Sequence, residues 1–130
     1  MNTDRGKSNQ EYLYIRLINH SEDYIEKHLD SSISLADLAK HTNYSDYHYH
    51  RLFKQYAHET VQQFITRFKL ERAAIFLVTN QSITLTETAL AYGYYDASSF
   101  SRAFKRQFGK SPSAFRKQQE MTRTLRKIMP

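Results

Sequence analysis

The sequence predicts an all-α fold in which a short helical unit occurs twice. Residues 47–64 and 98–115 repeat one pattern at an offset of 51. The matching positions are Arg51 and Arg102, Phe53 and Phe104, Lys54 and Lys105, Thr60 and Ser111, and Phe64 and Phe115. The 130 residues include only three Gly and two Pro, which favours helices joined by tight turns over a sheet-rich fold.

The repeat continues upstream with a small change of register. Leu35 matches Leu85 and Ala39 matches Ala89, at an offset of 50. The second copy therefore has one extra residue in its turn. Two copies of one helical unit on a single basic chain indicate two equivalent contacts with one long, regular partner, and duplex DNA is such a partner.

The first half of the chain predicts three helices. Apolar residues recur at spacings of three and four over residues 14–29, as on one face of an amphipathic helix. A second, short helix is predicted by the apolar stripe at residues 35–39, with Ser34 or a neighbour available as its N-cap. Residues 42–45 break the pattern, and a third helix with one apolar face follows over about 46–56.

The second half repeats this plan after a long helix. That helix runs over about residues 60–78 and is rich in apolar side chains. A short helix is expected over about 85–91, a turn over 92–96 and a further helix over about 97–108. Pro112 suits the first position of a last helix, because proline needs no hydrogen-bond partner for its nitrogen there.

Three residues are suited to the special backbone of the turns. Asn43 tolerates the left-handed conformation that a tight turn requires, and Gly93 adopts it freely. Gly109 is placed to end the helix that precedes it. The resulting plan has a flexible N-terminus over residues 1–13, a domain over 14–118 with a first helix-turn-helix at about 35–56, a linker helix at about 60–78 and a second helix-turn-helix at about 85–108, and a basic tail over 119–130.

Composition limits the classes of function. The formal net charge is +6 and the pI is about 9.5, values typical of chains that bind nucleic acid or other polyanions. Cysteine is absent, which excludes disulfides and thiolate chemistry and fits the cytoplasm. The polar N-terminus and the lack of a long apolar stretch predict no contact with a membrane.

The outer face of the second helix in each unit carries groups that bind DNA. In the first unit these are Tyr47, His50, Arg51 and Lys54, and in the second they are Ser98, Ser101, Arg102 and Lys105, at the same i, i+3, i+4, i+7 spacing. Neither set includes an acidic residue, which would repel phosphate. A short helix, a tight turn and a second helix of this kind match the helix-turn-helix pattern.

The chemistry of these side chains divides them into two roles. Arg51 and Arg102 are the strongest candidates for base contact, because a guanidinium binds guanine O6 and N7 together. His50 and Tyr47 are also suited to a base edge or a thymine methyl. Lys54 and Lys105, one turn further along, are better suited to phosphates, as is Arg106 beside Lys105. For the two arginines the alternative is an intramolecular ion pair or a phosphate contact, and for the lysines, His50 and Tyr47 it is ordinary solvent exposure.

The long middle helix separates the two units. About 18 residues at a rise of 1.5 Å span about 27 Å, which with the flanking units approaches one turn of DNA, about 34 Å. Its basic residues Arg67, Lys69 and Arg72 are candidate phosphate contacts, with a solvated face or an internal ion pair as the alternative.

No residue pattern predicts catalysis or a cofactor. The six histidines lack metal-ligand spacing, and neither a glycine-rich phosphate loop nor paired carboxylates occur. The sequence therefore predicts no metal, no cofactor and no enzyme.

Several stretches together resemble the DNA-binding domain of the AraC/XylS family. They are Leu35-Ala36-Asp37-Leu38-Ala39, Arg51-Leu52-Phe53-Lys54, Arg72-Ala73, Tyr92-Gly93-Tyr94 with Asp96, Phe100-Ser101-Arg102-Ala103-Phe104-Lys105, and Phe108-Gly109-Lys110-Ser111-Pro112 followed by Phe115-Arg116. The resemblance covers residues 14–118, and its C-terminal half is the more specific part.

The resemblance implies a fold and a function. The fold has seven helices, with two helix-turn-helix subdomains joined by a linker helix. The function is that of a sequence-specific transcription regulator, most often an activator that contacts RNA polymerase, whose two recognition helices enter successive major grooves of duplex DNA. The base-contacting residues carried over are Tyr47, His50, Arg51, Ala97, Ser98, Ser101 and Arg102.

Two unlike recognition helices on one chain predict binding as a monomer to an asymmetric site. Other interpretations stay open at this point. One alternative is the DNA-binding part of a larger ligand-sensing regulator. The others are a basic module that binds a protein and an RNA-binding or architectural protein. The operator, the target genes and the inducing signal are not given by the sequence.

Overall fold

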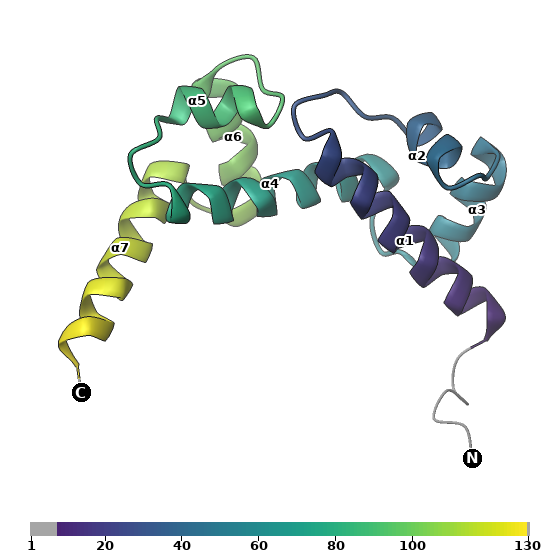
Figure 1. Ribbon diagram of the computed structural model, residues 1–130, viewed down its shortest axis with the longest axis horizontal. Coiled ribbons are helices and arrows are strands. Elements are labelled where there is room, and N and C mark those ends of the chain that lie inside the picture. The colour runs from purple at the N-terminus through teal and green to yellow at the C-terminus, as the bar shows by residue number, and fades with distance from the viewer. Residues whose placement is uncertain (1–7, 130) are drawn as a thin grey trace. The chain divides into compact units, whose positions relative to one another are not determined.

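Residues 8–129, the part of the chain that the computed structural model describes, form seven α-helices and no strand (Figure 1). The helices are α1 (Asn9–Lys27), α2 (Leu35–His41), α3 (Asp46–Tyr56), α4 (Val61–Thr79), α5 (Leu85–Ala91), α6 (Ala97–Phe108) and α7 (Pro112–Ile128). The predicted all-α, seven-helix fold class is confirmed. None of these helices combines the length and the apolar character that crossing a membrane requires.

The helices fold as two compact units, each with its own helix-turn-helix. The first unit contains α1, α2, α3 and α4 as far as Phe68. The second contains the rest of α4 from Lys69, together with α5, α6 and α7. The second unit also includes the short segment Leu29–Ser31, which follows α1 in the sequence.

Aromatic side chains form the core of the first unit. Tyr49 and Phe53 of α3 and Phe64 of α4 are almost completely buried, and the ring centroids of Phe53 and Phe64 are 5.7 Å apart. The Tyr49 hydroxyl is 2.7 Å from the Ser21 hydroxyl, which itself donates to the Leu17 carbonyl at 2.7 Å. Burial raises the pKa of Tyr49 to about 12, so this polar pair stays neutral inside the core.

The core of the second unit has the same kind of packing. Leu70, Ala73 and Leu77 of α4 contact a cluster that includes Phe100 and Phe104 of α6. The Phe104 ring centroid lies 4.6 Å from that of Phe108 and 5.5 Å from that of Phe115 on α7. Burial of one such side chain is worth about 1.5–3 kcal/mol, so these rings stabilise the packing of α6 in the core of the second unit.

The end of α4 is capped by residues of α7. The last turn of α4 has no basic residue of its own. Arg116 instead donates from Nε to the Leu77 carbonyl at 3.1 Å and from Nη1 to the Ile83 carbonyl at 3.0 Å. Arg123 donates to the Val78 carbonyl at 3.0 Å. The Leu77 and Val78 carbonyls lie in the last turn of α4, at the negative end of the helix dipole, whereas that of Ile83 lies in the following loop.

Both ends of the described chain are helical. Helix α1 begins at Asn9, so residues 9–13, which the sequence placed in a flexible N-terminus, are helical, and Ser8 and Glu11 form a capping box at this end. Residues 1–7 lie outside the described range. The basic tail is also helical as far as Ile128, since no Gly or Pro interrupts α7 after Pro112.

The first helix, predicted to extend to Leu29, is two residues shorter in the structure. α1 ends at Lys27, and Leu29 packs against the core of the second unit. Lys69 donates a hydrogen bond from Nζ to the Ser31 carbonyl of the same segment. Lys69 is only 9% exposed, and its pKa is lowered by loss of hydration. The predicted phosphate contact of Lys69 is therefore wrong: its ammonium group is used inside the protein.

Candidate nucleic-acid interface

Helix α3 presents one apolar and one polar face. The hydroxyl of its N-cap, Ser45, accepts a hydrogen bond from the backbone N–H of His48 at 3.1 Å, which fixes the start of the helix. Its inner face buries Tyr49, Leu52 and Phe53. The outer face carries the four predicted residues Tyr47, His50, Arg51 and Lys54, all of which are exposed. Tyr47 is 68% exposed, which is unusual for a side chain of its size.

Helix α6 has the corresponding arrangement in the second unit. The carboxylate of its N-cap, Asp96, accepts from the backbone N–H of Ser99 at 2.7 Å. This hydrogen bond is the main reason that the pKa of Asp96 is lowered, and a charged cap stabilises the helix start. Phe100 and Phe104 are fully buried beneath the helix. Ser98, Arg102, Lys105 and Arg106 are exposed, whereas Ala97 and Ser101 are half-buried.

The exposed cations of the two helices are not used to hold the fold together. Within residues 8–129, no hydrogen bond or ion pair joins the side chain of Arg51, Lys54, Arg102 or Lys105 to another residue. Each unit therefore has a guanidinium and an ammonium group on one helix face, one turn apart and available to an external anion.

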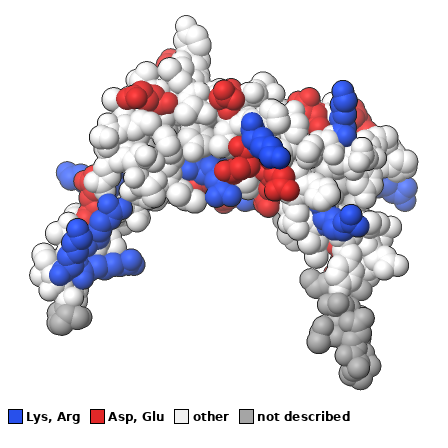
Figure 2. Space-filling model, in the orientation of Figure 1, with Lys and Arg blue, Asp and Glu red and all other residues white. Residues whose placement is uncertain are grey.

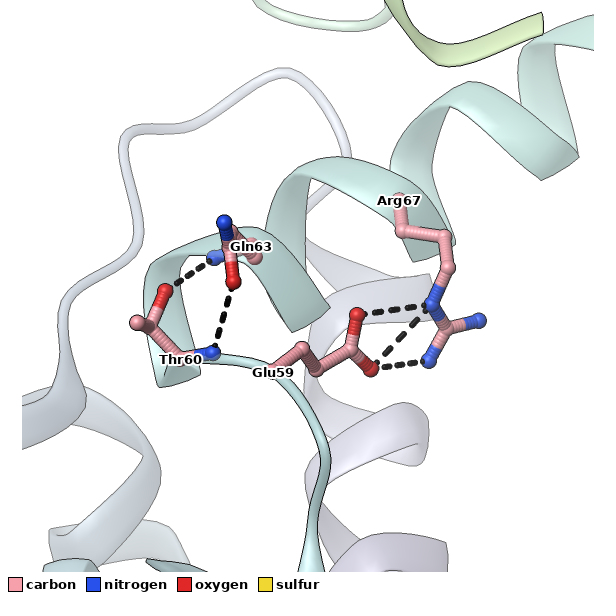
Figure 3. Close-up of polar contacts among 4 residues, drawn as sticks. All are labelled: Glu59, Thr60, Gln63 and Arg67. Carbon is pink, nitrogen blue, oxygen red and sulfur yellow. Dashed lines mark hydrogen bonds and ion pairs between the residues drawn. The ribbon is translucent and has the colours of Figure 1, made fainter.

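Arg67 has a different environment from these cations. Its Nε donates to both carboxylate oxygens of Glu59, at 3.0 and 3.2 Å, and its Nη2 donates to one of them at 2.7 Å (Figure 3). Thr60 and Gln63 form a capping box beside this pair, so the start of α4 is well ordered by local hydrogen bonds. A phosphate would have to share the Arg67 guanidinium with Glu59.

A second group of basic residues lies on α7. Figure 2 shows Lys and Arg side chains gathered over this helix, at the lower left of the view. The basic residues of α7 are Arg116, Lys117, Arg123, Arg126 and Lys127. Arg116 and Arg123 bond to carbonyls at the end of α4, so their first role is structural. Within the described chain, no group of His, Asp and Glu side chains has the geometry to hold a metal ion.

The fold and the two helix faces define a helix-turn-helix protein, and comparisons identify its family. Residues 38–118 match the family described as "Helix-turn-helix domain". The regulatory protein SoxS of Escherichia coli is 32% identical over 93 residues, which are 72% of this chain and 86% of SoxS. The Msm operon regulatory protein of Streptococcus mutans is 31% identical over 101 residues, 78% of this chain but only 36% of that protein.

Solved structures give the same result. The C-terminal domain of AraT, a response regulator from Geobacillus stearothermophilus, superposes with a TM-score of 0.68 at 28% identity, over 85% of this chain and 88% of that one. The chain belongs to the AraC/XylS family of helix-turn-helix transcription regulators and carries the DNA-binding domain of that family. The resemblance predicted from the sequence is therefore confirmed.

Proposed function

We propose that this protein is a sequence-specific regulator that binds one asymmetric site on double-stranded DNA. In this proposal α3 and α6 act as recognition helices in successive major grooves, and a single chain occupies the site. The observation that supports the proposal is the equivalence of the two helices. Each is capped at its start by a side chain, anchored by buried aromatic rings and lined outside by cations without internal partners.

The two outer faces would read different bases. We assign base contacts to Tyr47, His50 and Arg51 in the first unit and to Ala97, Ser98, Ser101 and Arg102 in the second. Ala97 has no hydrogen-bonding side chain, so its contact would be apolar, with a thymine methyl. The different side chains at matched positions are the reason to expect a site without palindromic symmetry.

Phosphate contacts would set the position of each helix on the duplex. We assign them to Lys54, Lys105 and Arg106, which are exposed. Arg67 is a weaker candidate, because Glu59 already binds its guanidinium and neutralises its charge.

At the level of the cell, we propose an activator that acts in the cytoplasm and contacts RNA polymerase. This extends the proposal beyond DNA binding and is supported by the family alone. Activation is measured by in vitro transcription from a template that carries the selected site. The expected result is that adding the protein increases the amount of transcript.

The DNA contacts are tested by binding measurements on purified variants. A duplex selected from a random pool serves as the specific site, and an unrelated duplex of equal length as the reference. Arg51→Ala and Arg102→Ala should each reduce the preference for the selected duplex by about 1–3 kcal/mol, each at a different part of the site. Lys54→Ala and Lys105→Ala should weaken binding to both duplexes and reduce the salt slope by about one.

Lys27→Ala is the matched control, since Lys27 is an exposed cation on α1, outside both recognition helices. It should leave the preference for the selected duplex unchanged. If both arginine variants kept the full preference of the wild type, base reading by these helices would be refuted. Tighter binding to single-stranded DNA or RNA than to any duplex, or binding to an acidic protein in place of DNA, would favour the other interpretations of the basic surface.

A further inference from the structure

The structure locates the extra residue of the second helix-turn-helix. In the first unit the turn after α2 contains Asn43, which has a φ of 64°, and the Tyr44 N–H donates to the Ala39 carbonyl at 2.9 Å. In the second unit Gly93 has a φ of 83°, and the Tyr94 N–H donates to the Ala89 carbonyl at 2.8 Å. Tyr44 and Tyr94 are therefore structurally equivalent.

The two turns diverge after these tyrosines. In the first unit the next residue, Ser45, is already the N-cap of the recognition helix. In the second unit the N-cap is Asp96, so one residue, Tyr95, lies between Tyr94 and the cap. Tyr95 is thus the insertion that changes the offset of the repeat from 50 to 51.

Tyr95 has no structural role within its unit. It is 90% exposed, and within the described chain its ring packs against no other ring and its hydroxyl has no hydrogen-bond partner. Its neighbour Tyr94 behaves in the opposite way, since it is half-buried with its ring centroid 5.5 Å from that of Phe100. An exposed tyrosine offers an apolar ring and a polar tip, a combination suited to contact with a partner.

The position of Tyr95 indicates what that partner group is. It comes directly before the N-cap of α6, two residues from Ala97 and three from Ser98. The first residues of a recognition helix approach the base edges, so the residue before its cap lies at the rim of the groove, where the sugar–phosphate backbone runs. Tyrosine hydroxyls are among the groups that bind phosphate oxygens in protein–DNA complexes.

We propose that Tyr95 is a DNA-backbone contact found in the second unit alone. Its hydroxyl donates a hydrogen bond to one phosphate oxygen beside α6, and its ring packs on the adjoining deoxyribose. This contact rests on the proposed function, because it requires α6 to dock on duplex DNA. The contact positions α6 on the duplex but does not depend on the base sequence. It is a DNA-backbone contact that the first unit lacks.

The test is the Tyr95→Phe variant, which removes only the hydroxyl. It should bind the selected duplex about threefold to tenfold more weakly, the loss typical of one hydrogen bond. It should keep the base preferences of the wild type. The salt slope should also stay unchanged, because a neutral hydroxyl displaces no counterion, whereas Lys105→Ala lowers the slope by about one. A thermal melt of each variant checks that the fold is intact.

The phosphate itself is identified by chemical substitution. Each phosphate of the selected duplex is replaced in turn by a methylphosphonate, which lacks one acceptor oxygen and the charge. At one position beside the α6 half-site, the methylphosphonate should reduce the affinity of Tyr95→Phe by a smaller factor than it reduces the affinity of the wild type. Unchanged affinity of Tyr95→Phe, equal losses at every phosphate, or altered base preferences would each overturn the proposal. If Arg102→Ala relaxes base preference while Tyr95→Phe has no effect, only the Tyr95 contact fails; if the wild type selects no duplex, the proposed function fails.

Discussion

At the residue scale, two glycines adopt the same left-handed conformation in different surroundings. Gly93 has a φ of 83° and Gly109 a φ of 79°. A Cβ atom on Gly109 would meet no atom within 4 Å, whereas one on Gly93 would lie 3.2 Å from the Asp30 carbonyl oxygen and 3.3 Å from that of Leu29. Gly93 is therefore required both by its conformation and by the segment that packs against its turn.

This difference predicts unequal losses of stability. Gly109→Ala should lower the free energy of unfolding by about 1–2 kcal/mol, the cost of the left-handed conformation alone. Gly93→Ala should lower it by about 1–3 kcal/mol more, because two backbone carbonyls must also move. Urea denaturation followed by circular dichroism measures both, and equal losses would contradict the close approach at Gly93.

At the element scale, α7 holds the end of α4 through Arg116. The guanidinium reaches the carbonyls of Leu77 and Ile83, and more distantly that of Asn80 at 3.4 Å. Arg116 is half-buried and the carbonyls lie 33 to 39 residues away in the sequence, so this contact joins separate parts of the second unit.

Loss of these contacts should destabilise the protein. Arg116→Ala is expected to lower the free energy of unfolding by about 2–3 kcal/mol, since hydrogen bonds that involve a charged donor are worth about 1.5–3 kcal/mol. Lys117→Ala, an exposed change one position along the same helix, is the control and should cost less than about 0.5 kcal/mol. Similar urea midpoints for the two variants would show that the capping contacts contribute nothing.

At the scale of the whole molecule, a single chain carries both units, and α4 runs without a break from one to the other. If α3 and α6 bind together, the spacing of their half-sites should matter. An insertion of five base pairs between the half-sites should weaken binding on the order of 100-fold, because the base contacts of one unit are then lost. The same insertion outside the site should have no effect. Gel-shift titrations measure both, and equal affinities would indicate binding through one unit.

The sequence predicted the local features of the fold and the candidate faces. Ser34 caps α2, Asn43 and Gly93 turn left-handed, and Pro112 begins α7, as their residue types indicate. Residues of α3 spaced by three, four and seven all lie outward. Helical period alone therefore located the first candidate face. The contacts of these residues with DNA stay predictions.

What the sequence by itself determined were the features that depend on hydrogen bonds and side-chain periodicity within about one turn of chain: the order of the helices, the caps, the turn residues and the outward cations. The tertiary structure decided which charged groups are used inside the protein, such as Lys69 at Ser31 and Arg116 at the end of α4. It also decided that Leu29 packs in the second unit and that Tyr95 is the exposed insertion, although the change of repeat offset was a signal for the latter. The physical reason is that these outcomes depend on residues more than 30 positions apart or on which surfaces remain uncovered, and neither is encoded in a local pattern.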